Sequence, residues 1–348
     1  TMRDGDIVVL RGHEVAGILK GRELDIVDLV GRAYVAHRQG ETSLPHSSFL
    51  RFADSDSNRI IALPARLGGE FGKAGIKWVS SFPGNVERGL DRASAVLVLN
   101  STETGRPEAI LEGSVISAKR TAASAALAAR ALHGRAETDL GLIGCGLINR
   151  EIARFVLAVR PEIRRLVIQD VDPKRAADFK RKFEYEAEGV EVQVESRAER
   201  VMEQTRLLSL ATTAITSHIS DLGGLNEGST ILHISLRDIS PEMILACDNV
   251  VDDPDHVCRA QTSVHLAEQQ AGDRSFIRCC LADVLTGSSP ARRDEKSIVV
   301  FSPFGLGILD VALGKLVLEE GIRLGKATVI DSFLPPSWAG SRVHGSRT

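Results

Sequence analysis

The chain has 348 residues, of which 43% are hydrophobic and 26% are charged, and its formal net charge is −3. Its Lys and Arg residues are dispersed among acidic residues, and no apolar run approaches the ~20 residues that cross a bilayer. These features predict a globular protein that binds neither nucleic acid nor a membrane. The start shows no basic segment followed by an apolar one, which predicts a cytoplasmic protein.

The first part of the chain, residues 1 to about 116, is expected to form an α+β domain. Gly, Pro, Asn and Asp interrupt its apolar segments, a pattern typical of an antiparallel or mixed sheet joined by turns. The expected strands lie at residues 6–10, 59–67, 75–82 and 93–100. Two helices, over 13–20 and 23–38, are expected to pack on this sheet.

An alanine-rich segment, residues 114–132, predicts a helix between the two halves of the chain. From about residue 137 onward, β-branched apolar runs alternate with helical stretches, which favours a doubly wound parallel sheet of the Rossmann type. The expected strands lie at 139–144, 164–170, 190–196, 207–214, 229–236 and 248–253.

The C-terminal segment 307–325 has apolar residues at helical spacing, and we expect it to return to the first domain. The sequence therefore predicts an α/β protein of two domains. The first comprises residues 1–116 and 307–348. The second, a nucleotide-binding domain, comprises residues 117–306.

The segment GLIGCGLINR, residues 141–150, contains two of the three glycines of a dinucleotide-binding turn, Gly144 and Gly146, with Asn149 in the third position. A strand precedes this turn and a helix follows it. The next strand ends at Asp170, where a carboxylate would accept hydrogen bonds from a ribose diol. NAD is therefore favoured over NADP, although the nearby Lys174 and Arg175 weaken that preference. The alternative is a tight turn without a ligand.

Other polar residues follow strands at the edge where doubly wound sheets bind ligands. Alternatively, these residues are merely solvated loop positions. The cofactor-binding residues that we expect in addition to Gly144, Gly146 and Asp170 are Thr121, Leu147, Ile148, Thr212, Thr213 and Ser235.

Three charged residues are candidates for chemistry. Lys77 lies inside an apolar strand and Arg120 near the start of the alanine-rich helix, and both could bind substrate carboxylates. Asp238 follows a strand of the nucleotide-binding domain and could act as a general acid or base. The alternatives are a surface lysine, a solvated arginine and a helix N-cap at Asp238, although Ser240 fits the capping role better.

The cysteines and histidines give no metal signature. The odd number of cysteines and the absence of a C-x-x-C pair argue against a disulfide framework and a zinc site, so we expect free thiols and no metal. His256 and His265 are nine residues apart, not four. The cysteines are Cys145, Cys247, Cys258, Cys279 and Cys280.

Several long segments resemble the ornithine cyclodeaminase/μ-crystallin family. They are GIKWVSSFPGN, ETGRPEAILEGSVISAKRTAASAALAA, GLIGCG, VDPKRAADF and LHISLRD, which stand in the family's order and spacing. Three more segments look most like the branch that makes 2,3-diaminopropionate for siderophores and peptide antibiotics. These are RIIALPARLGG, HISLRDISPE and VVDDPDHVCRAQTSVHLAEQ.

The resemblance implies a homodimer that pairs through the sheets of its first domains and binds NAD and a small amino-acid substrate. It implies that Lys77 and Arg120 bind the substrate carboxylate, that Asp238 is the catalytic acid or base, and that Lys77 also belongs to the catalytic residues. Arg51 is a candidate for an N-terminal arginine of the family, although its segment does not align cleanly. The first domain would then bind substrate and form the dimer.

The expected reaction is the NAD-dependent oxidative hydrolysis of N-(2-amino-2-carboxyethyl)-L-glutamate to 2,3-diaminopropionate and 2-oxoglutarate, with formation of NADH. One alternative is an ornithine cyclodeaminase or a ketimine or amino-acid reductase on the same scaffold. The other is a binding protein that resembles μ-crystallin and keeps the nucleotide without chemistry.

Overall fold

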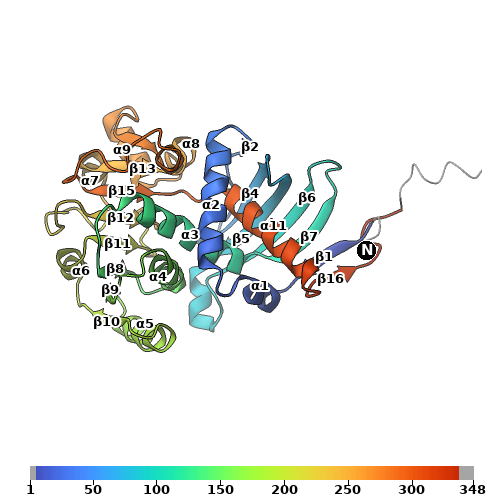
Figure 1. Cartoon of the computed structure of the whole chain (residues 1–348), viewed down its shortest axis with the longest axis horizontal. Helices are drawn as coiled ribbons and strands as arrows, with labels where there is room; N and C mark the ends of the chain where they lie inside the picture. Colours follow the sequence, from blue (N-terminus) through green and yellow to red (C-terminus); the bar gives the residue numbers. More distant parts are fainter. Residues whose placement is uncertain (1–4, 337–348) are drawn as a thin grey trace, which may run out of the picture. The chain divides into compact units, whose positions relative to one another are not determined.

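In the computed structural model, which describes residues 5–336, the chain forms two compact units (Figure 1). The first contains the described residues up to Lys20, Thr42–Ser117 and the described residues from Asp310 onward. The second contains Gly21–Glu41 and Ala118–Leu309. The ends of the expected first domain, residues 1–4 and 337–348, lie outside the described part.

The first unit is built on a mixed, largely antiparallel sheet with strand order β16-β1-β7-β6-β5-β4-β2, in which β3 pairs with β4. The β1–β7 pair is parallel, and β4, β5 and β6 form long antiparallel ladders. The strands are β1 (Ile7–Leu10), β2 (Thr42–Ser43), β3 (Ser48–Phe52), β4 (Ser55–Leu67), β5 (Lys73–Ser81), β6 (Ala93–Ser101), β7 (Pro107–Glu112) and β16 (Thr328–Ile330).

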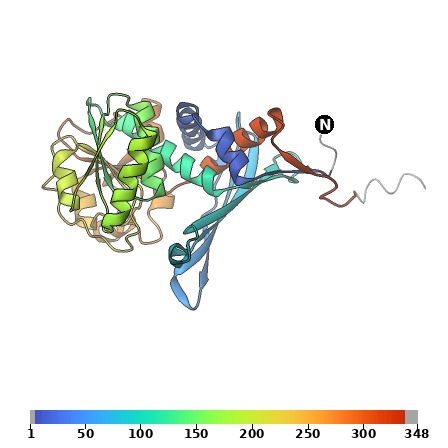
Figure 2. The same cartoon turned by 90° about the horizontal axis from the view of Figure 1, so that it is seen from below.

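One face of this sheet is covered by the long C-terminal helix α11 (Gly307–Arg323), which lies along one side of the strands (Figure 2). A Cβ added at Gly314 would lie 2.4 Å from a methyl group of Leu97, so a larger residue here would force Leu97 or α11 to shift. The expected return of this segment to the first sheet is thus observed. Two shorter elements complete the unit: α1 (Gly12–Leu19) and the 3-10 helix η1 (Pro83–Arg88).

The second unit contains a parallel sheet with strand order β10-β9-β8-β11-β12-β15-β13-β14. This confirms the expected doubly wound sheet, although the sequence reading missed β14 and β15, the latter of which lies between β12 and β13. The strands are β8 (Asp139–Ile143), β9 (Arg165–Gln169), β10 (Glu191–Val194), β11 (Leu207–Leu210), β12 (Thr230–His233), β13 (Asp248–Val251), β14 (Ile277–Cys280) and β15 (Val299–Ser302).

The helices of the second unit include the alanine-rich helix α3, which spans residues Ser114–Leu132 as expected and begins in the first unit. Helix α2 belongs here too, whereas the sequence reading placed it on the first sheet. Its Tyr34 hydroxyl lies 2.7 Å from Ser124 Oγ of α3. The other helices are α4 (Leu147–Val159), α5 (Pro173–Glu186), α6 (Ala198–Gln204), α7 (Pro241–Ala246), α8 (Pro254–Val257), α9 (Ser263–Ala271) and α10 (Leu281–Leu285), and α2 spans Glu23–Arg38.

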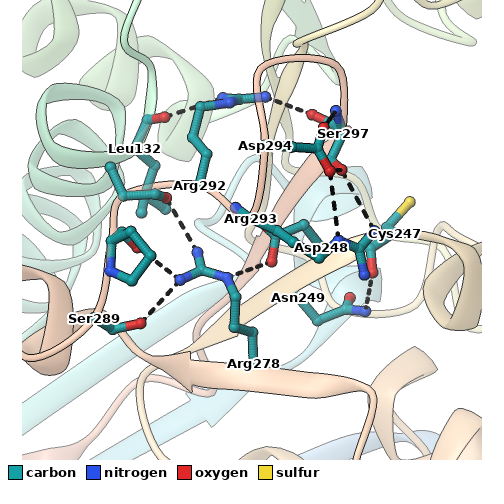
Figure 3. A network of polar contacts seen from close by, with 12 residues as sticks. Leu132, Cys247, Asp248, Asn249, Arg278, Ser289, Arg292, Arg293, Asp294 and Ser297 are labelled. Atoms are coloured by element: carbon teal, nitrogen blue, oxygen red, sulfur yellow. Dashed lines mark hydrogen bonds and ion pairs between the residues drawn. The ribbon is translucent and has the colours of Figure 1, made fainter.

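Two arginines, Arg278 and Arg292, form hydrogen bonds and an ion pair at the amino ends of neighbouring parallel strands (Figure 3). Arg278 forms a 2.6 Å ion pair with Asp248, the first residue of β13. Arg292 donates to the carbonyl of Leu132 at the end of α3 and to Thr230 Oγ1 at the start of β12, at 3.0 Å each. These contacts lie at the amino ends of β12, β13 and β14, whereas doubly wound sheets bind ligands beyond the carboxyl ends of their strands.

None of the helices described between residues 5 and 336 is long and apolar enough to cross a membrane. The five cysteines are all free thiols. In the same part of the chain, no group of three or more His, Cys, Asp or Glu side chains could hold a metal ion.

Candidate active site

The glycine-rich turn lies between β8 and α4 in the second unit. Gly144 has a φ of +92°, and a Cβ there would lie 2.4 Å from the carbonyl oxygen of Ala211, so this position requires glycine. Gly146 caps the N-terminus of α4, and nothing lies within 4 Å of its added Cβ. The N-terminus of α4 therefore has open space beside Gly146, and the N-terminus of a helix suits an anionic pyrophosphate.

Asn149 occupies the position of the third glycine and is fully buried. Its side-chain amide donates to the carbonyls of Ile143 and Gly144, at 2.9 and 2.6 Å, and its oxygen accepts from Ser209 Oγ at 2.8 Å. The asparagine thus ties the turn to β8 and to the neighbouring strand β11. These side-chain hydrogen bonds fix the turn, a role that close packing of a third glycine would otherwise have.

Asp170 follows β9 and contacts the glycine-rich turn directly. Its carboxylate accepts the backbone N–H of Cys145 at 2.7 Å and that of Asp172 at 2.9 Å. Arg175 donates to the same carboxylate at 3.2 Å. The acidic residue expected beside the ribose therefore stands at the turn, and the nearby arginine that weakened the preference for NAD is paired with it.

Three large apolar side chains are exposed in segments that follow neighbouring parallel strands. Leu147, Val171 and Ile215, after β8, β9 and β11, are 60%, 92% and 83% exposed. A flat aromatic ring bound at this edge would cover such side chains. Together with the open turn and Asp170 they fit a dinucleotide. Val171 and Ile215 were not predicted, although a lone apolar residue just beyond a strand end could have indicated them.

A group of polar side chains surrounds Asp238, which is fully buried after β12. Thr212 Oγ1 and Ser235 Oγ both donate to its carboxylate, and His218 Nε2 lies 3.0 Å from its Oδ1. We call Asp238, Thr212, His218 and Ser235 the Asp238 cluster. Thr212 and Ser235, which were expected to bind the cofactor, therefore direct their hydroxyls at the expected catalytic acid.

Within the Asp238 cluster, the pKa of the carboxyl group is lowered and that of the imidazole is raised. Burial would raise the pKa of Asp238, but hydrogen bonds from His218, His233 and Ser235 and the nearby His233 charge outweigh burial and hold that pKa well below its usual range. The hydrogen bond to Asp238 in turn raises the pKa of His218. The site therefore holds an ionised carboxylate beside an imidazole that gains a proton readily.

The backbone fixes this arrangement. The N–H groups of His218 and Ile219 both donate to the carbonyl of Asp238, at 2.9 Å each. Leu236 adopts a φ of +67°, which is strained for a leucine and re-aims the chain between Ser235 and Asp238. Sequence reasoning missed His218, although its position a few residues after β11, at the same edge of the sheet, could have indicated it.

Lys77 lies on β5 in the first unit and is only 2% exposed, which excludes the surface-lysine alternative. Its Nζ donates to both carboxylate oxygens of Asp310 and to Ser117 Oγ, all at 2.9 Å. Asp310 stands on α11 and is fully buried. The sequence reading did not predict either partner.

Arg120 lies on α3 in the second unit and is buried rather than solvated. Its guanidinium packs against Gly305, where an added Cβ would lie 2.7 Å from Nη1. The Gly305 N–H donates at 2.9 Å to the fully buried Asp252, whose pKa burial raises to about 6. Ser240 caps α7, so the capping alternative for Asp238 does not apply.

The remaining predicted residues have less defined surroundings. Thr121 is half-buried on α3, Ile148 is half-buried on α4, and Thr213 is exposed after β11. Arg51 is exposed on β3 with its guanidinium 5.6 Å from the ring centroid of Phe49.

Asp170, the glycine-rich turn and the Asp238 cluster all follow strands of the parallel sheet, so they share its carboxyl edge.

Comparisons with known proteins agree with this architecture. N-((2S)-2-amino-2-carboxyethyl)-L-glutamate dehydrogenase of Staphylococcus aureus is 28% identical over 313 residues, which cover 88% of this chain and 93% of that enzyme. The structure of Thermococcus litoralis Δ1-pyrroline-2-carboxylate reductase, solved with NADH and L-proline, is 25% identical with a TM-score of 0.86, over 92% of this chain and 99% of that one.

An archaeal alanine dehydrogenase, solved as a dimer with bound NAD, is 25% identical with a TM-score of 0.84, over 94% of this chain and 99% of that one. Residues 8–323 match the family that these features indicated. The chain belongs to the ornithine cyclodeaminase/mu-crystallin family.

Proposed function

We propose that the protein is an NAD-dependent cytoplasmic enzyme that converts N-(2-amino-2-carboxyethyl)-L-glutamate and water to 2,3-diaminopropionate and 2-oxoglutarate, with formation of NADH. The observation that carries this proposal is the similarity to the Staphylococcus aureus dehydrogenase over 88% of the chain. The product would serve as a precursor of a siderophore or a peptide antibiotic.

The residues of the carboxyl edge suit the proposed cofactor. Gly144, Gly146, Leu147 and Ile148 would bind the pyrophosphate at the start of α4, and Asp170 the adenosine ribose. We propose that Thr121 and Thr213 line the same site, together with the Thr212 and Ser235 of the Asp238 cluster. When bound, NAD would accept the hydride from the α-carbon of the glutamate moiety.

Proton transfer is the task proposed for the Asp238 cluster. The secondary ammonium of the substrate must lose a proton before hydride can leave, because the electron pair left on nitrogen then forms the carbon–nitrogen double bond. Asp238 is fully buried, while the side chain of His218 is 42% exposed. We therefore propose that the proton reaches solvent through His218, which Asp238 orients and stabilises in its charged form.

The same cluster can serve the hydrolytic half of the reaction. Loss of hydride leaves a carbon–nitrogen double bond in the substrate, and water adds to its carbon. The cluster would take a proton from that water and return one to nitrogen as the C–N bond breaks. The products are then a primary amine and a keto acid, and the balance is one water consumed and one hydride transferred.

The substrate carboxylates are assigned to two cations. Arg120 of the second unit offers a guanidinium that can bind a carboxylate through two parallel hydrogen bonds. Lys77 of the first unit offers an ammonium whose position is fixed by Asp310 and Ser117. We propose that both bind substrate and that they position its α-hydrogen for transfer.

Replacing Arg120 by Ala is expected to raise the KM of the amino-acid substrate by about tenfold to a hundredfold, because a charge-assisted pair contributes about 1.5–3 kcal/mol. The kcat should change much less. Arg120→Lys should recover only part of the affinity, because lysine lacks the planar fork. Steady-state kinetics checks this. Arg130→Ala, which removes a partly exposed arginine from the same helix, is the matched control.

A second copy of the chain is the proposed partner. Cross-strand pairing places Trp78 opposite Ala62 and Val96, and Ile76 opposite Val98, on the face of the first sheet that points away from Lys77. Trp78 is 40% exposed there, and its apolar neighbours are only half-buried. Such a face suits an isologous pairing of two sheets.

Substituting Trp78 with Glu should convert a dimer to a monomer, because a charge would be buried without a partner in the contact. Light scattering after size-exclusion chromatography measures the mass. Tyr185→Glu, at a side chain 93% exposed on α5, is the matched control and should leave the mass unchanged. A monomeric unsubstituted protein would contradict the proposal.

The function is tested by incubating the protein with NAD and the glutamate adduct, following NADH absorbance and identifying products by mass spectrometry. Equal amounts of NADH, 2,3-diaminopropionate and 2-oxoglutarate are expected. L-Ornithine converted without net NADH would instead indicate a cyclodeaminase, and NADH consumption with Δ1-pyrroline-2-carboxylate a reductase. Tight NAD binding without turnover of any of these would indicate a binding protein.

A further inference from the structure

Three arginines gather at one end of the first unit's sheet. Arg51 on β3 lies directly opposite Arg59 on β4, and Arg59 lies directly opposite Ser81 on β5. The guanidinium of Arg92, just before β6, donates through Nε to Ser81 Oγ at 3.4 Å. Directly opposite residues project to the same face of a sheet, so the side chains converge. We call Arg51, Arg59 and Arg92 the arginine cluster.

The arginine cluster is electrostatically unfavourable by itself. Burial lowers the pKa of Arg59, and the charge of Arg51 lowers it further. Burial and the charge of Arg59 act on Arg92 in the same way. No described group accepts a hydrogen bond from the buried Nε of Arg59. Among the side chains that the structure describes, no carboxylate forms an ion pair with any of the three arginines.

Such a cluster suits an anion. Like charges directly opposite each other on paired strands destabilise a sheet, and a buried guanidinium nitrogen without an acceptor adds to that cost. A bound carboxylate would remove both costs, because its oxygens accept from planar guanidinium groups in a bidentate geometry. The cluster therefore has the composition of an incomplete ion-pair network.

The arginine cluster faces the same side of the sheet as Lys77. On β5, Ser81 follows Lys77 by four residues, and residues an even number apart project to the same face. Four residues of strand span about 13 Å between backbone positions at about 3.3 Å each. Long arginine side chains shorten that gap. Positive charge therefore lies at two positions along β5, at Lys77 and, beside Ser81, at the arginine cluster.

We propose that the arginine cluster binds a distal carboxylate of a substrate that carries several carboxylates, while another carboxylate of the same molecule is bound at Lys77. This inference rests on the proposed function, in which the glutamate adduct has three carboxylates. The cluster then acts as a specificity determinant. It favours a polycarboxylate amino acid and disfavours ornithine, whose side-chain ammonium the three guanidinium groups repel.

The first test measures binding without turnover. Isothermal titration calorimetry of the whole protein with tricarballylate, an unreactive tricarboxylate, is compared with that of an Arg59→Met/Arg92→Met variant. The double variant should bind about tenfold more weakly or worse, since two charge-assisted contacts are removed. The matched control is Arg66→Met. It removes the same charge from an exposed position on β4 that projects to the opposite face.

The second test measures turnover of the glutamate adduct by the same variants. The double variant should show a raised KM with a nearly unchanged kcat, whereas Arg66→Met should match the unsubstituted enzyme. Arg59→Lys keeps the charge but not the fork, and should lie between the two. This single change also serves if the double variant does not fold, as judged by circular dichroism. It should still weaken tricarballylate binding more than Arg66→Met does.

The outcomes separate the two proposals. If the adduct is not turned over but tricarballylate binding depends on Arg59 and Arg92, the proposed function fails and the carboxylate site stands. If the adduct is turned over and neither KM nor tricarballylate binding changes in the variants, the site is overturned. Displacement of tricarballylate by equimolar inorganic phosphate would also overturn it, because the cluster would then select anions by charge alone.

Discussion

The Asp238→Asn enzyme is expected to bind its amino-acid substrate and turn it over about 10²- to 10⁴-fold more slowly, the usual contribution of a positioned acid or base. Asparagine keeps the shape of the side chain but removes the charge that accepts from Thr212, Ser235 and His218. Without that charge, His218 loses the partner that favours its protonated form. The loss should therefore fall on kcat rather than on KM.

A spectroscopic readout shows whether the loss comes through His218. In the unsubstituted protein the hydrogen bond to Asp238 raises the pKa of His218, so the imidazolium persists to a higher pH than usual. In Asp238→Asn that pKa should fall. NMR titration of the His218 ring, without substrate or NAD, measures this directly.

A control separates charge loss at Asp238 from charge loss nearby. Asp221→Asn neutralises an exposed carboxylate three residues beyond His218, and should leave both turnover and the His218 titration unchanged. Near-normal turnover by Asp238→Asn would show that proton transfer occurs elsewhere. If turnover is normal but the His218 pKa shifts, the hydrogen bond between His218 and Asp238 exists but has no catalytic role.

The parts of the site that sequence reasoning could predict are those encoded within one short segment. The glycine-rich turn follows from a strand, two glycines and a helix in immediate succession, and Asp170 from the end of the next strand. The alanine-rich helix α3 is equally local, because intrinsic propensity decides it. Each of these features needs no knowledge of distant pairing.

The parts that could not be predicted depend on contacts between distant segments. Lys77 and Asp310 are 233 positions apart, and only the packing of α11 against β5 makes them partners. The arginine cluster depends on the registers of two strand pairs, β3 with β4 and β4 with β5, and sequence reasoning predicted β4 and β5 but neither β3 nor these registers. The helical pattern of α2 gives its buried face but not which of two sheets it joins.

The insertion of β15 between β12 and β13 illustrates the same limit. Both neighbours were expected as strands, but strand order in an open parallel sheet is set by the path of the crossovers, which periodicity does not reveal. This strand order still brings the residues that follow β11 and β12 together at the carboxyl edge of the sheet. Thr212 and Asp238, which follow β11 and β12, meet because these strands are neighbours whichever strand comes next.

Replacing Asp310 by Asn is expected to cost about 3–5 kcal/mol of the free energy of unfolding, the usual cost of breaking a buried ion pair from one side. Asparagine preserves the shape, so the change isolates the charge that holds Lys77 between α11 and β5. Both side chains are almost fully buried, so the Lys77 ammonium would be left beside a neutral amide instead of its buried counter-charge. Urea unfolding followed by circular dichroism measures the loss.

Two further variants decide whether the loss arises from this ion pair. Glu319→Gln neutralises a partly exposed partner of Lys315 on the same helix and should cost no more than about 0.5 kcal/mol. Lys77→Met with Asp310→Leu removes both charges, and the apolar pair should recover much of the stability, because Lys77 lies opposite the buried Leu97. If Asp310→Asn costs no more than Glu319→Gln, the pair does not anchor α11 to the sheet. If instead the apolar pair restores folding but not turnover, Lys77 is held in place for substrate rather than for stability.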